Sequence, residues 1–180
     1  MASLPDPTAT LTGEARAIYD DILARRKAKG SDRVYGPYIP LLNHPELARL
    51  IERLGYYLKY ESALPRDVYQ FIVLTVAKRS GVGFEWEDHI EAARSAGLSE
   101  SVIESIAAGA ACVPAPYDIV AETIDAAFAY RSIPQALQGR VIERFGVPGL
   151  IEIVTLCGFY TLIGMVNVCF DVPLPRRAHG

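Results

Sequence analysis

Apolar side chains recur along this chain at the three- and four-residue spacing of amphipathic helices. This pattern predicts helices over residues 11–29, 45–58, 64–80, 84–96, 99–106, 117–131, 134–144 and 149–170. The segment from Tyr35 to Pro40 is expected to be irregular, because two prolines three residues apart interrupt backbone hydrogen bonding. Alternating β-branched runs are scarce. The sequence therefore predicts an all-α protein, a single-domain helical bundle over residues 1–180.

Two predicted helices have features of their own. Asn43 is expected to cap the second helix, with Pro45 in its first turn and an apolar stripe of Leu47, Leu50, Ile51, Leu54 and Leu58. The last helix contains 18 consecutive uncharged residues, 153–170, which is the lower limit for a membrane span. Because Glu152, Asn167 and two glycines interrupt this apolar character, we interpret it as a core or subunit-interface helix and expect no membrane partner.

Composition narrows the class of protein further. The 180 residues carry a formal net charge of −3, with 51% apolar and 22% charged residues. Such a chain is folded, and it lacks the basic runs that bind a phosphate backbone, so nucleic acid is not an expected partner. The mean hydropathy of +0.17 is high for a monomer and suggests apolar surface between subunits.

Cysteine usage and the amino terminus bear on redox chemistry and location. The three cysteines, Cys112, Cys157 and Cys169, are far apart and form no CxxC pair, which disfavours a disulfide framework or a zinc ribbon. The polar start has no basic segment followed by an apolar one, so no signal peptide is predicted and a cytoplasmic location is expected.

Candidate chemistry is densest in residues 83–89, GFEWEDH. On a helix, Glu85, Trp86 and His89 are predicted to share an inward face, with Glu87 and Asp88 toward solvent. A carboxylate beside an imidazole raises the pKa of the imidazole, and such a pair suits general acid–base catalysis. Trp86 would supply an apolar wall of the pocket. The same spacing also occurs in helices where it only adds stability. One histidine and one inward carboxylate are too few for a metal site.

The segment LPRDVYQFIVLTVAKRSGVGFEWEDH, residues 64–89, resembles the core of the carboxymuconolactone decarboxylase family, within the alkyl hydroperoxidase D-like superfamily. The resemblance continues through AARSAGLSE (92–100) and GFYTLIGMVNVCFDVPLP (158–175), and it includes Gly36-Pro-Tyr38 and Asn43-His-Pro45. It covers about residues 35–175 and leaves 176–180 as a tail that contains His179. The expected fold is thus a bundle of the alkyl hydroperoxidase D-like type.

The resemblance implies roles for particular residues. His89 would donate and accept protons around a small carboxylated lactone, with Glu85 orienting it and no metal or organic cofactor. Trp86, Gln70 and Tyr38 would bind the substrate: Trp86 as a wall, Gln70 through a hydrogen bond to a substrate oxygen, and Tyr38 by closing the pocket. The family often has Glu where this chain has Gln70, and an amide cannot transfer a proton at neutral pH. Arg66 and Arg79 are the nearest candidate partners of a substrate carboxylate.

Several functions therefore remain open. The expected activity is a decarboxylase or lyase on a small carboxylated lactone of aromatic breakdown; the alternatives are an isomerase or lyase on another small oxygenated molecule, and a non-catalytic binding protein. A thiol peroxidase is disfavoured because Val82 and Glu85 occupy the two cysteine positions of that branch. The family also implies a homotrimer or hexamer. We expect His44 to belong to a helix start and Asn167 to satisfy a buried backbone or inter-subunit hydrogen bond.

Overall fold

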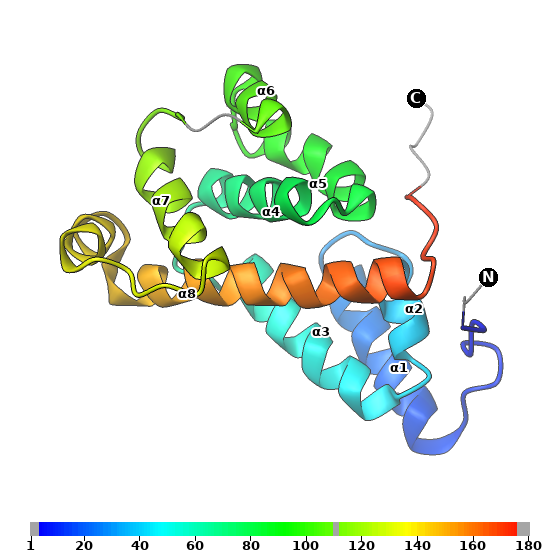
Figure 1. The fold of residues 1–180 in the computed structure, drawn as a ribbon. Helices are drawn as coiled ribbons and strands as arrows, with labels where there is room; N and C mark the ends of the chain where they lie inside the picture. The colour runs from blue at the N-terminus through cyan, green and yellow to red at the C-terminus, as the bar shows by residue number, and fades with distance from the viewer. Residues whose placement is uncertain (1–3, 110–111, 176–180) are drawn as a thin grey trace.

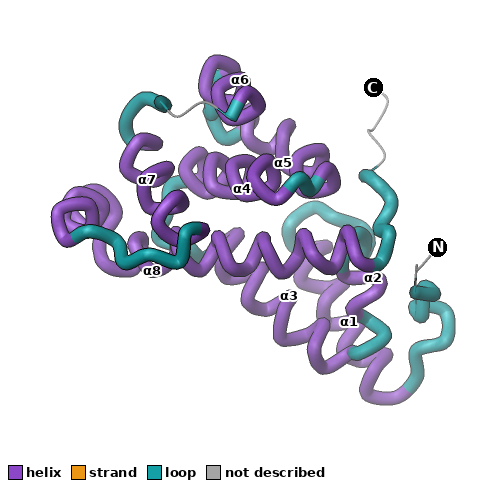
Figure 2. Tube along the Cα trace, viewed as in Figure 1, coloured by secondary structure: helices purple, strands orange, loops and turns teal. Residues whose placement is uncertain are grey.

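A computed structural model describes residues 4–109 and 112–175, and these residues form helices and loops (Figures 1 and 2). The elements are α1 (Gly13–Lys27), α2 (Tyr38–Leu41), α3 (Pro45–Tyr60), α4 (Arg66–Ser80), α5 (Gly83–Ser95), α6 (Glu100–Ala108), α7 (Tyr117–Phe128) and α8 (Gln135–Cys169). The predicted all-α fold is confirmed. The predicted tail, with His179, lies outside the described residues.

Helix α4 is the centre of the bundle. It packs against α5, α6, α7 and α8, and nine of its 15 residues are buried. In Figure 1, α8 crosses the middle of the molecule, with α4–α7 on one side and α1–α3 on the other. A second, smaller core joins α1 to the start of α3 through Ile22, Leu42 and Ala48. Ile51 of α3 packs against both cores and so joins them.

Helix α8 consists of two helical segments, as the pattern predicts. They meet at Gly146, whose φ of 72° and ψ of 172° are not helical, and Pro148 follows in the next turn. The whole element is long and apolar enough to cross a membrane, and 56% of its most apolar window is buried inside the protein. A core helix of a folded protein has the same composition.

Two local predictions are wrong. Residues 35–40 are not wholly irregular, because Tyr38–Leu41 form the single helical turn α2. Pro40 is compatible with this turn, because the first turn of a helix does not need the backbone N–H that proline lacks. His44, not Asn43, caps α3: its ring Nδ1 accepts a hydrogen bond from the amide of Leu47 at 3.3 Å. Asn43 instead donates to the carbonyl oxygens of Pro5 and Pro40.

The apolar stripe of α3 faces outward over much of its length. Leu58 is buried and Ile51 half-buried, but Leu47, Leu50 and Leu54 are exposed. The face turned toward the protein carries Ala48 and Glu52 instead. The polar face of α3 thus contributes to the interior of this chain, and its apolar face is left uncovered.

Candidate active site

A cavity of about 120 Å³ lies where α1, α3, α5 and α8 meet. Aromatic rings line it: Tyr35, Tyr38, Tyr56, Tyr60, Phe84, Phe159 and Tyr160. Its ionisable side chains are Arg26, Glu52, Lys59, Glu85, Asp88 and His89. Such an aromatic pocket with a few converging polar groups is typical of a small-molecule site.

Two glycines allow this packing. Gly36 has a φ of +65°, and a Cβ there would lie 2.6 Å from the ring of Phe84. At Gly55 a Cβ would lie 2.7 Å from the ring of Phe159 and 2.9 Å from the Tyr38 hydroxyl. A side chain at either position would displace a wall of the cavity.

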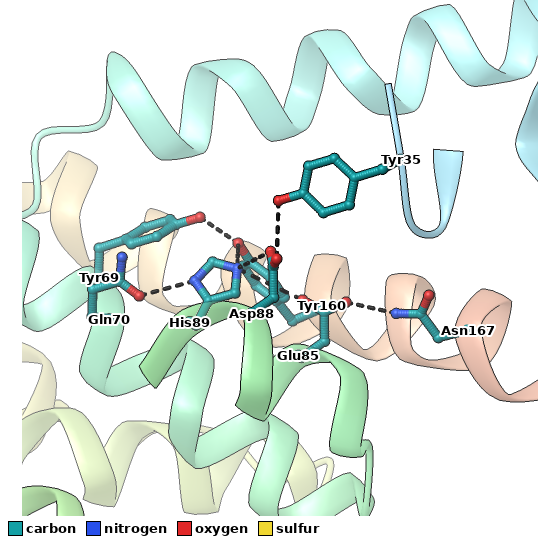
Figure 3. Close-up of polar contacts among 8 residues, drawn as sticks. All are labelled: Tyr35, Tyr69, Gln70, Glu85, Asp88, His89, Tyr160 and Asn167. Atoms are coloured by element: carbon teal, nitrogen blue, oxygen red, sulfur yellow. Dashed lines mark hydrogen bonds and ion pairs between the residues drawn. The ribbon is translucent and has the colours of Figure 1, made fainter. Parts of the chain in front are cut away.

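His89 is fixed by a neutral partner. Its Nδ1 lies 2.9 Å from Oε1 of Gln70, and both side chains are buried (Figure 3). Because an amide oxygen only accepts, Nδ1 carries the proton in this contact, and Nε2 of the neutral ring is left as an acceptor. Gln70 therefore selects the tautomer whose free nitrogen faces the cavity.

Three oxygen-bearing groups surround that free nitrogen. Nε2 of His89 lies 3.5 Å from the Tyr160 hydroxyl, 3.7 Å from Oε2 of Glu85 and 3.9 Å from Oδ2 of Asp88. Tyr160 comes from α8, whereas Glu85 and Asp88 share α5 with the histidine (Figure 3). The imidazole is thus placed to exchange protons with several groups and with a molecule in the cavity.

The imidazole is held neutral. Burial lowers the pKa of His89 well below its ordinary 6.5, and the positive charges of Lys59 and Arg66 lower it further. The sequence-based expectation that a neighbouring carboxylate raises this pKa is therefore wrong, because desolvation and two cations outweigh it. His89 is consequently a base at neutral pH, with its lone pair on Nε2.

Glu85 is the proton-bearing member of the pair. Burial, followed by the nearby charge of Asp88, raises its pKa to about 8, although Asn167 opposes the shift by donating a 2.7 Å hydrogen bond to Oε1. At neutral pH the carboxyl group is mostly protonated and uncharged. The Asn167 side chain thus donates its hydrogen bond to Glu85, and not to the backbone or across a subunit contact as expected.

This shift predicts a pH dependence of stability. Between the ordinary pKa of 4.5 and about 8, the unfolded chain loses the Glu85 proton while the folded chain keeps it. The free energy of unfolding should therefore fall as the pH rises through this window. In Glu85→Gln this contribution should vanish, which urea unfolding of both proteins at pH 5, 6.5 and 8 would measure. Parallel pH profiles for the two proteins would contradict the assignment.

Asp88 lines the cavity, contrary to the expectation that it faces solvent. Its Oδ1 accepts a 2.9 Å hydrogen bond from the hydroxyl of Tyr35, in the loop before α2. Burial, with the negative charge of Asp88, raises the pKa of Tyr35 and keeps its phenol protonated. This contact ties the loop before α2 to helix α5.

The cavity also holds two cations that sequence analysis missed. Lys59 and Arg26 have no ion-pair partner among residues 4–109 and 112–175, and Nε of Arg26 is buried without any hydrogen bond. Burial lowers the pKa of Lys59, while the charge of Asp88 favours its ammonium form. The Arg26 guanidinium lies 4.4 Å from the centre of the Tyr38 ring.

The two arginines singled out from the sequence lie elsewhere. Arg66 donates a hydrogen bond to the carbonyl oxygen of Lys59 and lies over the ring of Tyr69. Arg79 is paired with Asp125 at the protein surface. Neither lines the cavity, although the charge of Arg66 acts on His89.

Of the predicted substrate-binding residues, the structure places Tyr38 in the cavity wall and Trp86 outside it. Trp86 lines a separate open depression with Lys78 and Ala107, so its predicted place in the wall is corrected. Gln70 is corrected too, because it lies behind the histidine and reaches no cavity surface. Its Nε2 is buried without a hydrogen-bond partner.

Thiol chemistry has little support. Cys157 is buried, and burial raises the pKa of its thiol to about 12. Cys112 and Cys169 are exposed, and no cysteine lines the cavity among the residues described. Over the same residues, no group of three His, Cys, Asp or Glu side chains is arranged to hold a metal ion.

The fold and site thus define an all-α protein with a buried histidine–carboxyl pair in an aromatic cavity. Comparison with known families agrees: residues 45–116 match the carboxymuconolactone decarboxylase family, and the predicted resemblance is confirmed over that segment. The match suggests a carboxymuconolactone decarboxylase-like or alkyl hydroperoxidase-like role. No curated protein and no solved structure matches the chain.

Proposed function

We propose that this protein is a cofactor-independent carboxy-lyase that acts on a small, unsaturated, carboxylated lactone. The observation that carries the proposal is the 3.7 Å contact between His89 and Glu85, in a cavity that also contains two cations without ion-pair partners among residues 4–109 and 112–175. Burial lowers the pKa of His89 and raises that of Glu85 to about 8. Acid and base are both present at neutral pH, and the cations complement a carboxylate.

The proposed reaction uses only side chains of this chain. Lys59 and Arg26 would hold a carboxylate of the substrate, and the aromatic walls would enclose its ring. The bond between the ring carbon and the departing carboxyl group breaks, carbon dioxide leaves, and the bonding electrons move into the ring toward its carbonyl oxygen. A ring carbon then takes one proton from the Glu85–His89 pair, which solvent reloads.

The same acid–base pair supports a second candidate, an isomerase that moves a double bond in a small lactone. There His89 would remove a proton from one carbon while Glu85 delivers one to another. The protonation states favour this reading as well, because isomerisation needs a base and an acid together.

The first test is release of carbon dioxide from γ-carboxymuconolactone by purified protein. Turnover would support the carboxy-lyase. No release, combined with deuterium exchange into the ring of a lactone, would favour the isomerase. Binding without release or exchange would favour a non-catalytic binding protein.

We also propose that copies of this chain assemble through α3 and α8. Gly55 of α3 lies beside Phe159 of α8, and Tyr57 donates a 3.3 Å hydrogen bond to Glu152, so the two helices run together. Their outer faces expose large apolar side chains: Leu47, Leu50 and Leu54 on α3, and Ile151, Val154, Leu162, Met165 and Val168 on α8. Adjacent apolar surface of this kind is typical of subunit interfaces.

Placing a charge on this face should dissociate the assembly. Leu50→Glu and Met165→Glu are expected to lower the mass measured by light scattering, because a carboxylate cannot be buried without a partner. Tyr130→Glu is the matched control, since Tyr130 is 99% exposed on the loop before α8. A monomeric wild type at micromolar concentration would refute the proposed assembly.

A further inference from the structure

Tyr160 lines the cavity, and its hydroxyl has no role yet in the acid–base chemistry of Glu85 and His89. Its ring meets the imidazole of His89 edge to face, with centroids 5.4 Å apart and an interplanar angle of 89°. The side chain is buried, and its hydroxyl contacts two groups, Nε2 of His89 and the hydroxyl of Tyr69 (Figure 3). The direction of its proton decides what it can do.

The surroundings of Tyr69 fix that direction. Tyr69 is buried, and over residues 4–109 and 112–175 its hydroxyl has one hydrogen-bonding contact, Tyr160. The guanidinium of Arg66 covers its ring but cannot accept a hydrogen bond. If Tyr160 donated to Tyr69, the Tyr69 proton would be buried without an acceptor, and this would destabilise the folded protein. Tyr69 therefore donates, and the proton of Tyr160 is free to point elsewhere.

That proton is directed at the reacting space. Because Gln70 holds the proton of His89 on Nδ1, Nε2 is an acceptor for Tyr160, yet the 3.5 Å separation is longer than a strong hydrogen bond to nitrogen. A carbonyl oxygen bound in the cavity can therefore accept the Tyr160 hydrogen bond in place of Nε2. A donor fixed in this way in a buried site stabilises negative charge as it develops.

We propose that Tyr160 is a further catalytic residue, whose hydroxyl donates a hydrogen bond to the lactone carbonyl oxygen and stabilises its negative charge as carbon dioxide leaves. This inference rests on the carboxy-lyase function proposed above. No proton is transferred in this step: the electrons of the breaking carbon–carbon bond reach the carbonyl oxygen, and Tyr160 keeps its proton. Tyr69 is a positioning residue, since it acts through Tyr160.

Kinetics of tyrosine-to-phenylalanine variants test the assignment. Tyr160→Phe should lower kcat on γ-carboxymuconolactone about 10²- to 10³-fold, the usual effect of removing one such donor, and change KM little. Tyr69→Phe should lower kcat less, and the double variant should be no slower than Tyr160→Phe alone. Tyr117→Phe is the matched control, because it removes a phenol that donates to Asp67 outside the cavity.

A spectroscopic readout separates this inference from the proposed function. The infrared carbonyl stretch of bound muconolactone, which lacks the departing carboxyl group, should shift to lower frequency in wild type and Tyr117→Phe. The shift should be lost in Tyr160→Phe and reduced in Tyr69→Phe.

Each outcome has one meaning. Carbon dioxide release that Tyr160→Phe retains within twofold would overturn the role of Tyr160 and leave the carboxy-lyase standing. A carbonyl shift that depends on Tyr160, without carbon dioxide release, would overturn the carboxy-lyase and keep the hydrogen bond. Failure of wild type to bind either lactone would overturn both.

Discussion

Changing His89 to asparagine is expected to lower kcat for carbon dioxide release about 10²- to 10⁴-fold, the usual contribution of general acid–base catalysis. The imidazole lies beside Glu85 and can pass a proton between that carboxyl group and a substrate, through an Nε2 that Gln70 keeps unprotonated. Asparagine supplies an amide N–H near the position of Nδ1 and so retains a donor for Gln70. It has no basic atom at the position of Nε2.

His44→Asn is the matched control for this variant. His44 caps α3 outside the cavity, and asparagine is a favourable capping residue, so activity and unfolding temperature should stay near wild type. Steady-state kinetics of the three proteins measure the effect, with thermal unfolding as a check on the fold. A kcat within threefold of wild type in His89→Asn would remove the histidine from the mechanism.

The fold was largely predictable from the sequence because its helices obey periodicity and helix-stop rules. The break in α8 is an example. Gly146 ends one helical segment and Pro148 lies in the first turn of the next, and glycine and proline are the residue types that commonly mark helix ends and starts. The orientation of α3 was not predictable in this way. Its strongest apolar stripe faces outward, and periodicity reports that a face is apolar without reporting which partner covers it.

The site was predictable in part. Glu85 and His89 meet because residues four apart share one helix face. Trp86 and Asp88 lie about 80° to either side of that face, at 100° per residue, so spacing alone does not choose between them. Hydrophobicity favours Trp86 as the inward residue, yet the packing of α5 against α4 and α8 brings Asp88 to the cavity.

One further signal was present in the sequence. Three of the polar residues of the apolar helix, Glu152, Tyr160 and Asn167, follow one another at intervals of eight and seven and therefore lie on one side of it. All three are buried, and two of them contact the histidine–carboxyl pair. Lys59 and Arg26 gave no such signal, because a cation on a polar helix face is usually solvated.

Gln70 and burial together set the distribution of protons in the site. A carboxylate behind Nδ1 would favour a charged imidazole, whereas a neutral amide favours the uncharged ring. Burial then moves the pKa values of His89 and Glu85 in opposite directions, and the proton resides on the carboxyl group. The pair therefore works with Glu85 as acid and His89 as base.

Replacing Lys59 with methionine is expected to raise KM for a carboxylated lactone about 10- to 100-fold. A buried hydrogen bond to a charged group contributes about 1.5–3 kcal/mol, and each 1.4 kcal/mol is a factor of ten in affinity. Methionine keeps an apolar stem of similar length, so the cavity wall should be retained. Lys78→Met is the control, because Lys78 is exposed on α4 away from this cavity.

The same variant should also move the pH profile, and the direction follows from the charge. The ammonium of Lys59 disfavours a second positive charge on His89, so its removal should raise the pKa of the imidazole. The acidic limb of the pH profile of kcat would then shift to higher pH. His89 would become protonated, and so lose its basic nitrogen, at a higher pH than in wild type.

An uncharged lactone should bind Lys59→Met and wild type equally well. Weaker binding of that neutral lactone would show a collapsed cavity, and an unchanged KM for the carboxylated one would remove Lys59 from substrate binding.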